Sequence, residues 1–263
     1  MKISRSFLFA VIAFAALILQ AWADDEKKDE APAVDPQAVA ILKRAVDRLA
    51  DAKQFSVTTE IWEDTELEEG GRAQFTRIAD MKVRRPDRAR VDVRTSVPKR
   101  SFFYDGKSLS LLDYLKGFYG TISAPGTIDA MLDKVEQDYD VSFPLDDILV
   151  SRPFGDGAAK AKGAQYLGVE PVLGVVCHHL AFQSETIDWQ AWIEDGPVAV
   201  VRKVVITSKE DEGSPQLIAL FSHWDFTTEL PDFVFTFDPP PGTLKIEFVP
   251  APKEDAEAKP APK

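Results

Sequence analysis

The chain has 263 residues, with 43 acidic side chains against 31 basic ones and a formal net charge of −12. Such a chain repels nucleic-acid phosphates and gains nothing from an anionic membrane surface, so the composition argues against both as electrostatic partners. Its single cysteine cannot form an internal disulfide, so burial of apolar side chains must stabilise the fold.

The first residues have the pattern of a secretory signal. A short basic start precedes an apolar run from Phe7 to Leu19, and a small-x-small sequence ends at Ala23. We expect residues 1–23 to be removed and the protein to be periplasmic, in a Gram-negative bacterium. The apolar run is shorter than the roughly twenty residues of a membrane-spanning helix. Asp24, which follows the expected cleavage site, is not the cysteine of a bacterial lipid anchor. The sequence therefore predicts an exported protein that neither spans the membrane nor is anchored to it.

Two segments have too few apolar side chains to offset the entropy of ordering. Residues 24–34 form a charged, proline-containing linker, and residues 250–263 form a tail of Pro, Ala, Lys and Glu. We expect both to be disordered and the folded domain to occupy residues 35–249.

The domain begins with a predicted helix. Asp35 is a good N-cap, Pro36 suits the first helical position, and Leu42 and Leu49 belong to an apolar stripe at helical spacing. A second helix is predicted after Thr127, and a short helical piece over residues 144–150. The stripe of the second helix consists of Ile128, Met131, Leu132 and Val135.

From Phe55 onward the apolar period changes from 3.6 to 2, which indicates strands. Asp105 and Gly106 form the expected tight turn of a hairpin. The later segments at 164–170, 175–182, 188–194, 197–208, 216–226 and 233–237 also have strand character, and several are apolar on both faces. Strands that are dry on both faces need cover on both. We therefore expect an α+β fold: a strongly curved antiparallel sheet of about ten or eleven strands, with two or three helices over its concave side.

The segment GVVCHHLAF contains the only cysteine and two of the three histidines. On a strand, Cys177 and His179 share one face, roughly 6.6 Å apart, and His223 could supply a third metal ligand. Free cysteine is, however, among the most buried residue types, and a reactive thiolate needs a more polar setting than this apolar run. We favour a structural role over metal binding or catalysis, and we expect no cofactor.

One basic cluster stands out in this acidic chain. It consists of Arg84, Arg85, Arg88 and Arg90. Two interpretations are open: the arginines pair with nearby acidic residues on a solvated hairpin, or they form a docking site for an anionic head group or an acidic partner.

The segments RRPDRARVDV, FFYDGKSLSLLD, PGTIDAMLD, YLGVEPVLGVVCHHLAF, DWQAWIEDG and FTFDPPPGTLKIEF, in this order, resemble the predicted periplasmic proteins of domain-of-unknown-function family 2092. That family in turn is similar to the periplasmic lipoprotein carriers and receptors LolA and LolB and to a related sensor of envelope stress. The resemblance implies an unclosed half-barrel with a helical lid over a hydrophobic cavity that accepts acyl chains. No motif of this chain matches the functional arginine of the carrier.

We therefore expect a non-enzymatic protein that binds or carries a lipid, a lipoprotein acyl chain or another apolar ligand. The alternatives are an envelope sensor or interaction module that binds a membrane-protein segment, and a metal-binding protein. Whether the concave side is hollow or filled by side chains stays open. The candidate cavity residues are Phe103, Leu111, Phe118, Ile128, Met131, Leu132, Val135 and Trp192.

Overall fold

A computed structural model describes residues 34–141, 143, 145–154 and 161–251. The expected signal peptide, nearly all of the acidic linker and most of the C-terminal tail lie outside these ranges. None of the helices within them combines the length and the apolar character that a membrane span requires.

Both predicted helices begin at their predicted caps. Helix α2 (Pro36–Ala50) follows Asp35, whose carboxylate accepts a hydrogen bond from the backbone N of Gln37 at 2.8 Å. Helix α3 (Ile128–Tyr139) follows Thr127, whose hydroxyl accepts from the backbone N of Ala130 at 3.2 Å. These side chains satisfy N–H groups that have no partner inside the helix. The short helical piece is a single 3₁₀ turn, η1 (Asp146–Ile148).

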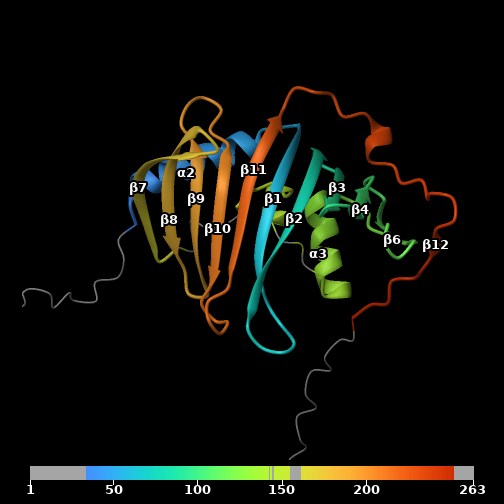
Figure 1. The fold of residues 1–263 in the computed structure, drawn as a ribbon. Coiled ribbons are helices and arrows are strands. Elements are labelled where there is room, and N and C mark those ends of the chain that lie inside the picture. Colours follow the sequence, from blue (N-terminus) through green and yellow to red (C-terminus); the bar gives the residue numbers. More distant parts are fainter. Residues whose placement is uncertain (1–33, 142, 144, 155–160, 252–263) are drawn as a thin grey trace, which may run out of the picture. The chain divides into compact units, whose positions relative to one another are not determined.

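The described strands form one sheet of twelve, in the order β12-β6-β5-β4-β3-β2-β1-β11-β10-β9-β8-β7 (Figure 1). Neighbouring strands are antiparallel, apart from β12 and β6, which are parallel. The strands are β1 (Gln54–Glu66), β2 (Arg72–Arg84), β3 (Arg88–Arg94), β4 (Pro98–Tyr104), β5 (Ser108–Asp113), β6 (Phe118–Ser123), β7 (Gly163–Val172), β8 (Val175–Gln183), β9 (Ile187–Glu194), β10 (Val201–Ser208), β11 (Gln216–Asp225) and β12 (Leu244–Lys245). The predicted large, curved and unclosed antiparallel sheet is confirmed.

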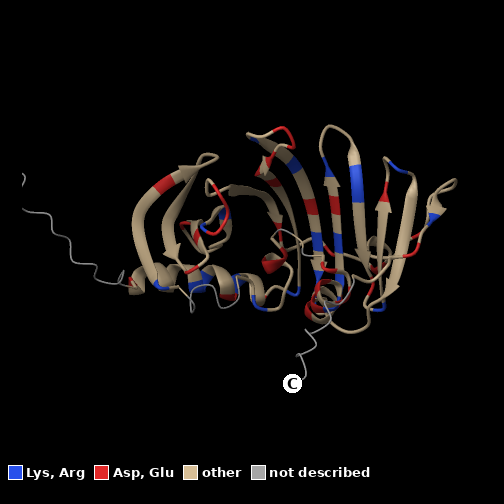
Figure 2. Ribbon diagram, turned by 90° about the horizontal axis from the view of Figure 1, so that it is seen from below, with Lys and Arg blue, Asp and Glu red and all other residues tan. Residues whose placement is uncertain are grey.

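The sheet bends around its main hydrophobic core, and Figure 2 shows the helices on one side of the bend. Alternate residues of β1, such as Phe55, Val57 and Ile61, enter this core, as do the apolar stripes of both helices. Helix α2 packs against β7, β8 and β9. Residues 143 and 145–149 contribute further apolar side chains to this core.

The predicted strand at 233–237 is wrong. Residues Asp232–Val234 form a second 3₁₀ turn, η2, and the chain then lies over the convex face of the sheet. The ring of Phe237 lies 5.3 Å from the rings of both Phe103 and Tyr119. Aromatic packing and the prolines around this segment, rather than a hydrogen-bonded ladder, determine its conformation.

Each edge of the sheet is covered in its own way. At the β6 edge, β12 pairs in parallel, and Phe248 then crosses Gly120 so closely that a Cβ there would lie 2.6 Å from the ring. At the β7 edge, the backbone N of Asp35 donates to the carbonyl of Ala164 at 2.9 Å. Farther along β7 an irregularity near Gly168 shifts its register with β8, and Pro171 offers no N–H.

Candidate functional site

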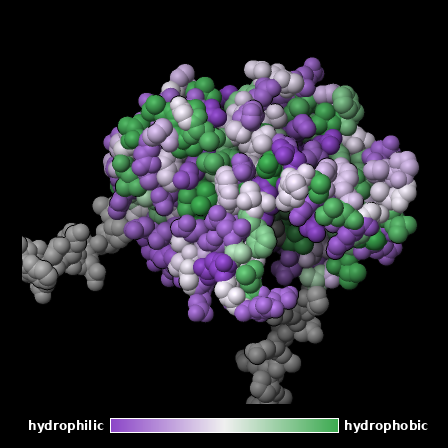
Figure 3. Space-filling model, in the orientation of Figure 1, coloured by the Kyte–Doolittle hydropathy of each residue, from purple (hydrophilic) through white to green (hydrophobic). Residues whose placement is uncertain are grey.

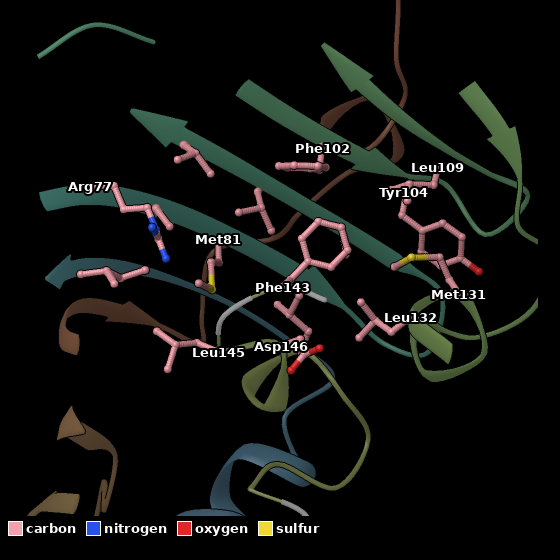
Figure 4. A pocket seen from close by; sticks show the side chains of 16 residues that line it. Arg77, Met81, Phe102, Tyr104, Leu109, Met131, Leu132, Phe143, Leu145 and Asp146 are labelled. Carbon is pink, nitrogen blue, oxygen red and sulfur yellow. The ribbon is translucent and has the colours of Figure 1, made fainter. Parts of the chain in front are cut away.

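A cavity of about 90 Å³ lies on the concave side, between strands β1 to β5, helix α3 and residues 143 and 145–149 (Figure 4). Of its sixteen lining residues only Arg77 and Asp146 carry a charge. Figure 4 shows Arg77 on the side of the cavity away from α3. The apolar lining includes Ala79, Met81, Ala89, Val91, Phe102, Leu109, Met131, Leu132, Phe143, Leu145 and Leu149.

Strand periodicity explains this lining. Every second residue of β2 and β3 faces inward, and two of these residues, Ala79 and Ala89, are small. On β4 the inward residues are Phe102 and Tyr104, and the Tyr104 hydroxyl turns away to donate to the carbonyl of Gly126 at 2.9 Å. Small side chains on the strands, opposite a helix that does not fill the space above them, leave the hollow.

Residues 145–151, here called the roof segment, close the cavity. The guanidinium of Arg85 donates to the carbonyl of Leu149 at 2.6 Å and to that of Ile148 at 3.3 Å. The carboxylate of Asp129 on α3 accepts from the hydroxyl of Ser151 at 2.8 Å. Leu145, the first residue of the roof segment, has a φ of +68°, a left-handed conformation that is uncommon for a large side chain. Hydrogen bonds from the sheet and from α3 therefore hold the part of the roof segment that follows Leu145 over an apolar hollow.

A second cavity, of about 110 Å³, lies on the other side of the roof segment, against β9 and β10. Leu145 lines both cavities. Phe154 and Trp189 also line the second one, and their rings are parallel with centroids 6.5 Å apart. Displacement of the roof segment would therefore join two spaces that it now separates.

The half-buried carboxyl of Asp146 is a titratable group in the lining of the first cavity. Burial raises the pKa of Asp146, and the neighbouring charges of Asp147 and of Glu136 on α3 raise it further, against an opposing effect of backbone hydrogen bonds. The guanidinium of Arg85 is affected in the opposite direction, because burial lowers its pKa while Asp129 raises it. Both shifts disfavour charge in the region under the roof segment.

The structure brings together only some of the candidate cavity residues. All four candidates on α3 (Ile128, Met131, Leu132 and Val135) enter the main core, and Met131 and Leu132 line the cavity. Leu111 pairs with Phe102 on the same strand face but does not line the cavity.

The other three candidates lie elsewhere. Phe103 packs against Phe237 on the convex face, Trp192 belongs to a small separate cluster on that face, and Phe118 begins the strand β6 near the sheet edge. The sequence reasoning did not single out Phe102 and Phe143, whose rings meet edge to face at 5.1 Å. Phe103, the neighbour of Phe102 in the sequence, is equally apolar, so only the strand register distinguishes these two residues, and only the path of the loop brings Phe143 to the cavity.

Each arginine of the basic cluster has a partner within the protein. Arg84 pairs with Asp232, Arg88 with Asp87 at 2.8 Å, and Arg90 with Asp92 at 2.9 Å. Arg85 instead donates to the roof segment. Arg84 also donates to the carbonyl of Leu230 at 2.8 Å, and the guanidinium of Arg90 lies 4.7 Å from the ring centre of Phe103. The cluster thus ties the sheet to the roof segment and to the C-terminal segment, while a docking role stays a prediction.

The residues considered for a metal site do not converge. Cys177 is on β8 and His223 on β11, with β9 and β10 between them, which corresponds to about 14 Å at the usual strand spacing. His179 stacks on Trp192 with ring centroids 4.0 Å apart. Burial raises the pKa of Cys177 to about 11, so the thiol stays protonated. No group of three potential metal ligands occurs among the residues that the structure describes.

Comparison with solved structures finds similar folds at low sequence identity. The lipoprotein LppX of Mycobacterium tuberculosis is 14% identical, with a TM-score of 0.49 over 75% of this chain and 100% of LppX. A LolA superfamily protein from Nitrosomonas europaea is 12% identical, with a TM-score of 0.42 over 76% of this chain and 97% of that protein. MucB in its complex with MucA from Pseudomonas aeruginosa is 10% identical, with a TM-score of 0.43 over 77% and 61% of the two chains.

No curated protein matches the sequence. The family described as "Predicted periplasmic protein (DUF2092)" matches residues 38–249, which is most of the chain. The chain therefore belongs to the DUF2092 family of predicted periplasmic proteins.

Proposed function

We propose that this protein is a non-enzymatic carrier that binds an acyl chain, of a lipid or a lipoprotein, in the concave cavity. The observation that carries the proposal is an apolar hollow closed by a roof segment that Arg85 and Asp129 tether through hydrogen bonds. Burial of a twelve-carbon chain contributes roughly 10 kcal/mol before ordering costs, at about 0.8 kcal/mol for each methylene. Binding of such a ligand needs no charged group inside the cavity.

The size of the cavity requires the roof segment to move. An apolar cavity of about 150 Å³ can hold benzene, so a space of about 90 Å³ admits only a few carbon atoms. A longer chain fits when the roof segment is displaced and the two cavities join. Each tether contributes on the order of 1 kcal/mol, which is similar to the gain from one or two buried methylenes. An entering chain can therefore offset the loss of the tethers, provided that it also covers the apolar side chains that the roof segment now buries, such as Ile148.

The chemistry of the lining supports binding rather than catalysis. The sixteen lining residues include no Ser, Thr, Cys or His, and so provide no nucleophile paired with a base. Cys177 lies on the opposite face of the sheet, where its raised pKa keeps it unreactive.

The test is displacement of a fluorescent dodecanoyl probe, together with native mass spectrometry of the purified protein. Ala79→Leu adds three carbons to the cavity wall and is expected to weaken probe binding roughly tenfold. Ala181→Leu makes the same change on β8, on the convex face of the sheet and away from the cavity, and serves as the matched control. Failure of the unmodified protein to bind any acyl probe up to its solubility limit would falsify the proposal. Equal losses in the two variants would place binding elsewhere, and co-purification of an envelope-protein segment in place of lipid would favour the interaction module.

A further inference from the structure

A groove adjoins the first cavity at the end formed by Arg77. It has a volume of about 420 Å³, and Arg77 and Val93 line both it and the cavity. The groove lies where strands β2 to β5 continue beyond α3, and it contains the turn between β5 and β6. A ligand could therefore occupy the cavity and the groove at the same time.

The groove is cationic although the protein is acidic. Its lining contains Arg77, Lys99, Arg100 and Lys116, against a single carboxylate, Asp113. The stretch from residue 72 to 104 has ten basic and three acidic side chains, in a chain whose formal net charge is −12. Figure 2 shows Lys and Arg positions recurring on neighbouring strands of the sheet.

Two of the four cations already have acidic partners. Arg77 pairs with Glu63, and Arg100 pairs with the buried carboxylate of Asp113 at 3.1 Å. Burial alone would raise the pKa of Asp113, but hydrogen bonds from the Lys116 backbone and from Arg100 produce a net lowering, so the carboxylate stays charged. Within the described part of the chain no carboxylate lies within ion-pairing distance of the ammonium groups of Lys99 and Lys116. The ammonium of Lys116 lies 5.8 Å from the ring centre of Phe118, a contact that leaves its charge without a counter-ion, so both lysines can meet an anion.

Exposed apolar side chains accompany the charges. Phe75 is 54% exposed and Leu115 is 63% exposed, and both line the groove. A groove for small, fully hydrated anions does not require them, whereas the first atoms of a hydrocarbon chain would pack on them. From the cavity outward, the order is an apolar hollow, then Arg77, then a cationic groove with apolar walls.

We propose that this groove binds the anionic head group, a phosphate or a carboxylate, of the amphiphile whose chain occupies the cavity. This inference rests on the proposed function and names its ligand class. Lys99 and Lys116 make the direct ionic contacts, and Arg77 lies at the junction of head group and chain. Charge complementarity at such a partly exposed site contributes more to selectivity among lipids than to affinity.

The test compares two ligands that share one lauroyl chain and a glycerol and differ only in a phosphate: lauroyl lysophosphatidic acid and monolauroylglycerol. Competition against the fluorescent dodecanoyl probe measures the ratio of their dissociation constants. We expect the phosphate form to bind on the order of tenfold more tightly at low salt, with a smaller ratio in 0.5 M NaCl, which is about the range that two exposed ionic contacts can supply. Inorganic phosphate alone serves as a further competitor.

The variant Lys99→Gln/Lys116→Gln is expected to bring the ratio close to one. Lys43→Gln/Lys209→Gln removes the same charge from lysines that pair with Asp47 and Asp188 elsewhere, and should keep the preference. Equal binding of both ligands by the unmodified protein overturns the head-group site but leaves the cavity proposal intact. Binding of neither ligand overturns both proposals. If inorganic phosphate displaces the probe at the same concentrations as the phosphate-bearing lipid does, the groove is a site for free anions, and the assignment to a head group is overturned.

Discussion

The two helices of this fold have the same kind of apolar stripe, yet they cover the sheet differently. Helix α2 faces β7 to β9 with two small residues, Ala38 and Ala45, set among large ones such as Leu42, and packs against these strands. Helix α3 presents larger residues such as Met131 and Leu132, while the strands beneath have the small residues, and a cavity lies between. The distribution of side-chain size, rather than the polar and apolar pattern, separates a packed contact from a hollow one.

The difference between the two contacts is tested most directly by adding the same side chain under α2 and under α3. Ala45→Leu forces extra carbons into the α2 contact and should lower the free energy of unfolding by about 1–3 kcal/mol. Ala79→Leu places them in the cavity and should change it by less than about 1 kcal/mol. Urea denaturation of both variants measures the difference. Equal destabilisation would mean that the space under α3 is as tightly packed as that under α2.

A second test concerns the tethers of the roof segment. Arg85→Met keeps an apolar stem but removes the hydrogen bonds to the carbonyls of Leu149 and Ile148. We expect local opening of the roof segment to become easier by about 1–2 kcal/mol. Amide hydrogen exchange at Ile148 and Leu149 should accelerate accordingly, while that of Leu42 in α2 should not. Unchanged exchange in the roof segment would show that apolar packing alone holds it.

The smallest expected effect concerns pH. Burial raises the pKa of Asp146 above its ordinary value of 3.8, so the folded state retains this proton at a pH at which the unfolded chain has lost it. At low pH the group is protonated in both states, and as the pH rises above 3.8 its ionisation increasingly favours the unfolded state. Asp146→Asn should therefore be more stable than the unmodified protein near pH 7, by less than about 1 kcal/mol because water screens a half-buried group.

The comparison to make is the difference in urea midpoint between the two proteins at pH 7 and at pH 3. The midpoint of Asp146→Asn should lie at a higher urea concentration than that of the unmodified protein at pH 7, and the two midpoints should nearly coincide at pH 3. A constant difference at both pH values would contradict the assignment, since a change in packing does not titrate.

Local signals in the sequence predicted much of this fold. Asp35 and Thr127 mark the starts of both helices because their side chains satisfy the first backbone N–H groups. Strand alternation predicted a curved antiparallel sheet, since strands that are apolar on both faces need cover on both.

The candidate site was less accessible to sequence reasoning. Phe102 and Phe103 are adjacent and equally apolar, and the strand register, which the sequence does not reveal, turns Phe102 to the core and Phe103 to the face that Phe237 covers. The cationic groove draws on residues 77, 99, 100 and 116, which come together through strand pairing and form no motif along the chain. Conversely, the conspicuous Cys177 and His179 belong to convex-face packing.

The covered edges of the sheet have a consequence for the protein in concentrated solution. An unclosed sheet offers two rows of backbone groups that could recruit strands from other molecules and start a fibril. Here β12 pairs with one row, and Asp35, the irregularity near Gly168 and Pro171 disturb the other. Such blocked edges let a sheet stay unclosed without pairing with the strands of other molecules.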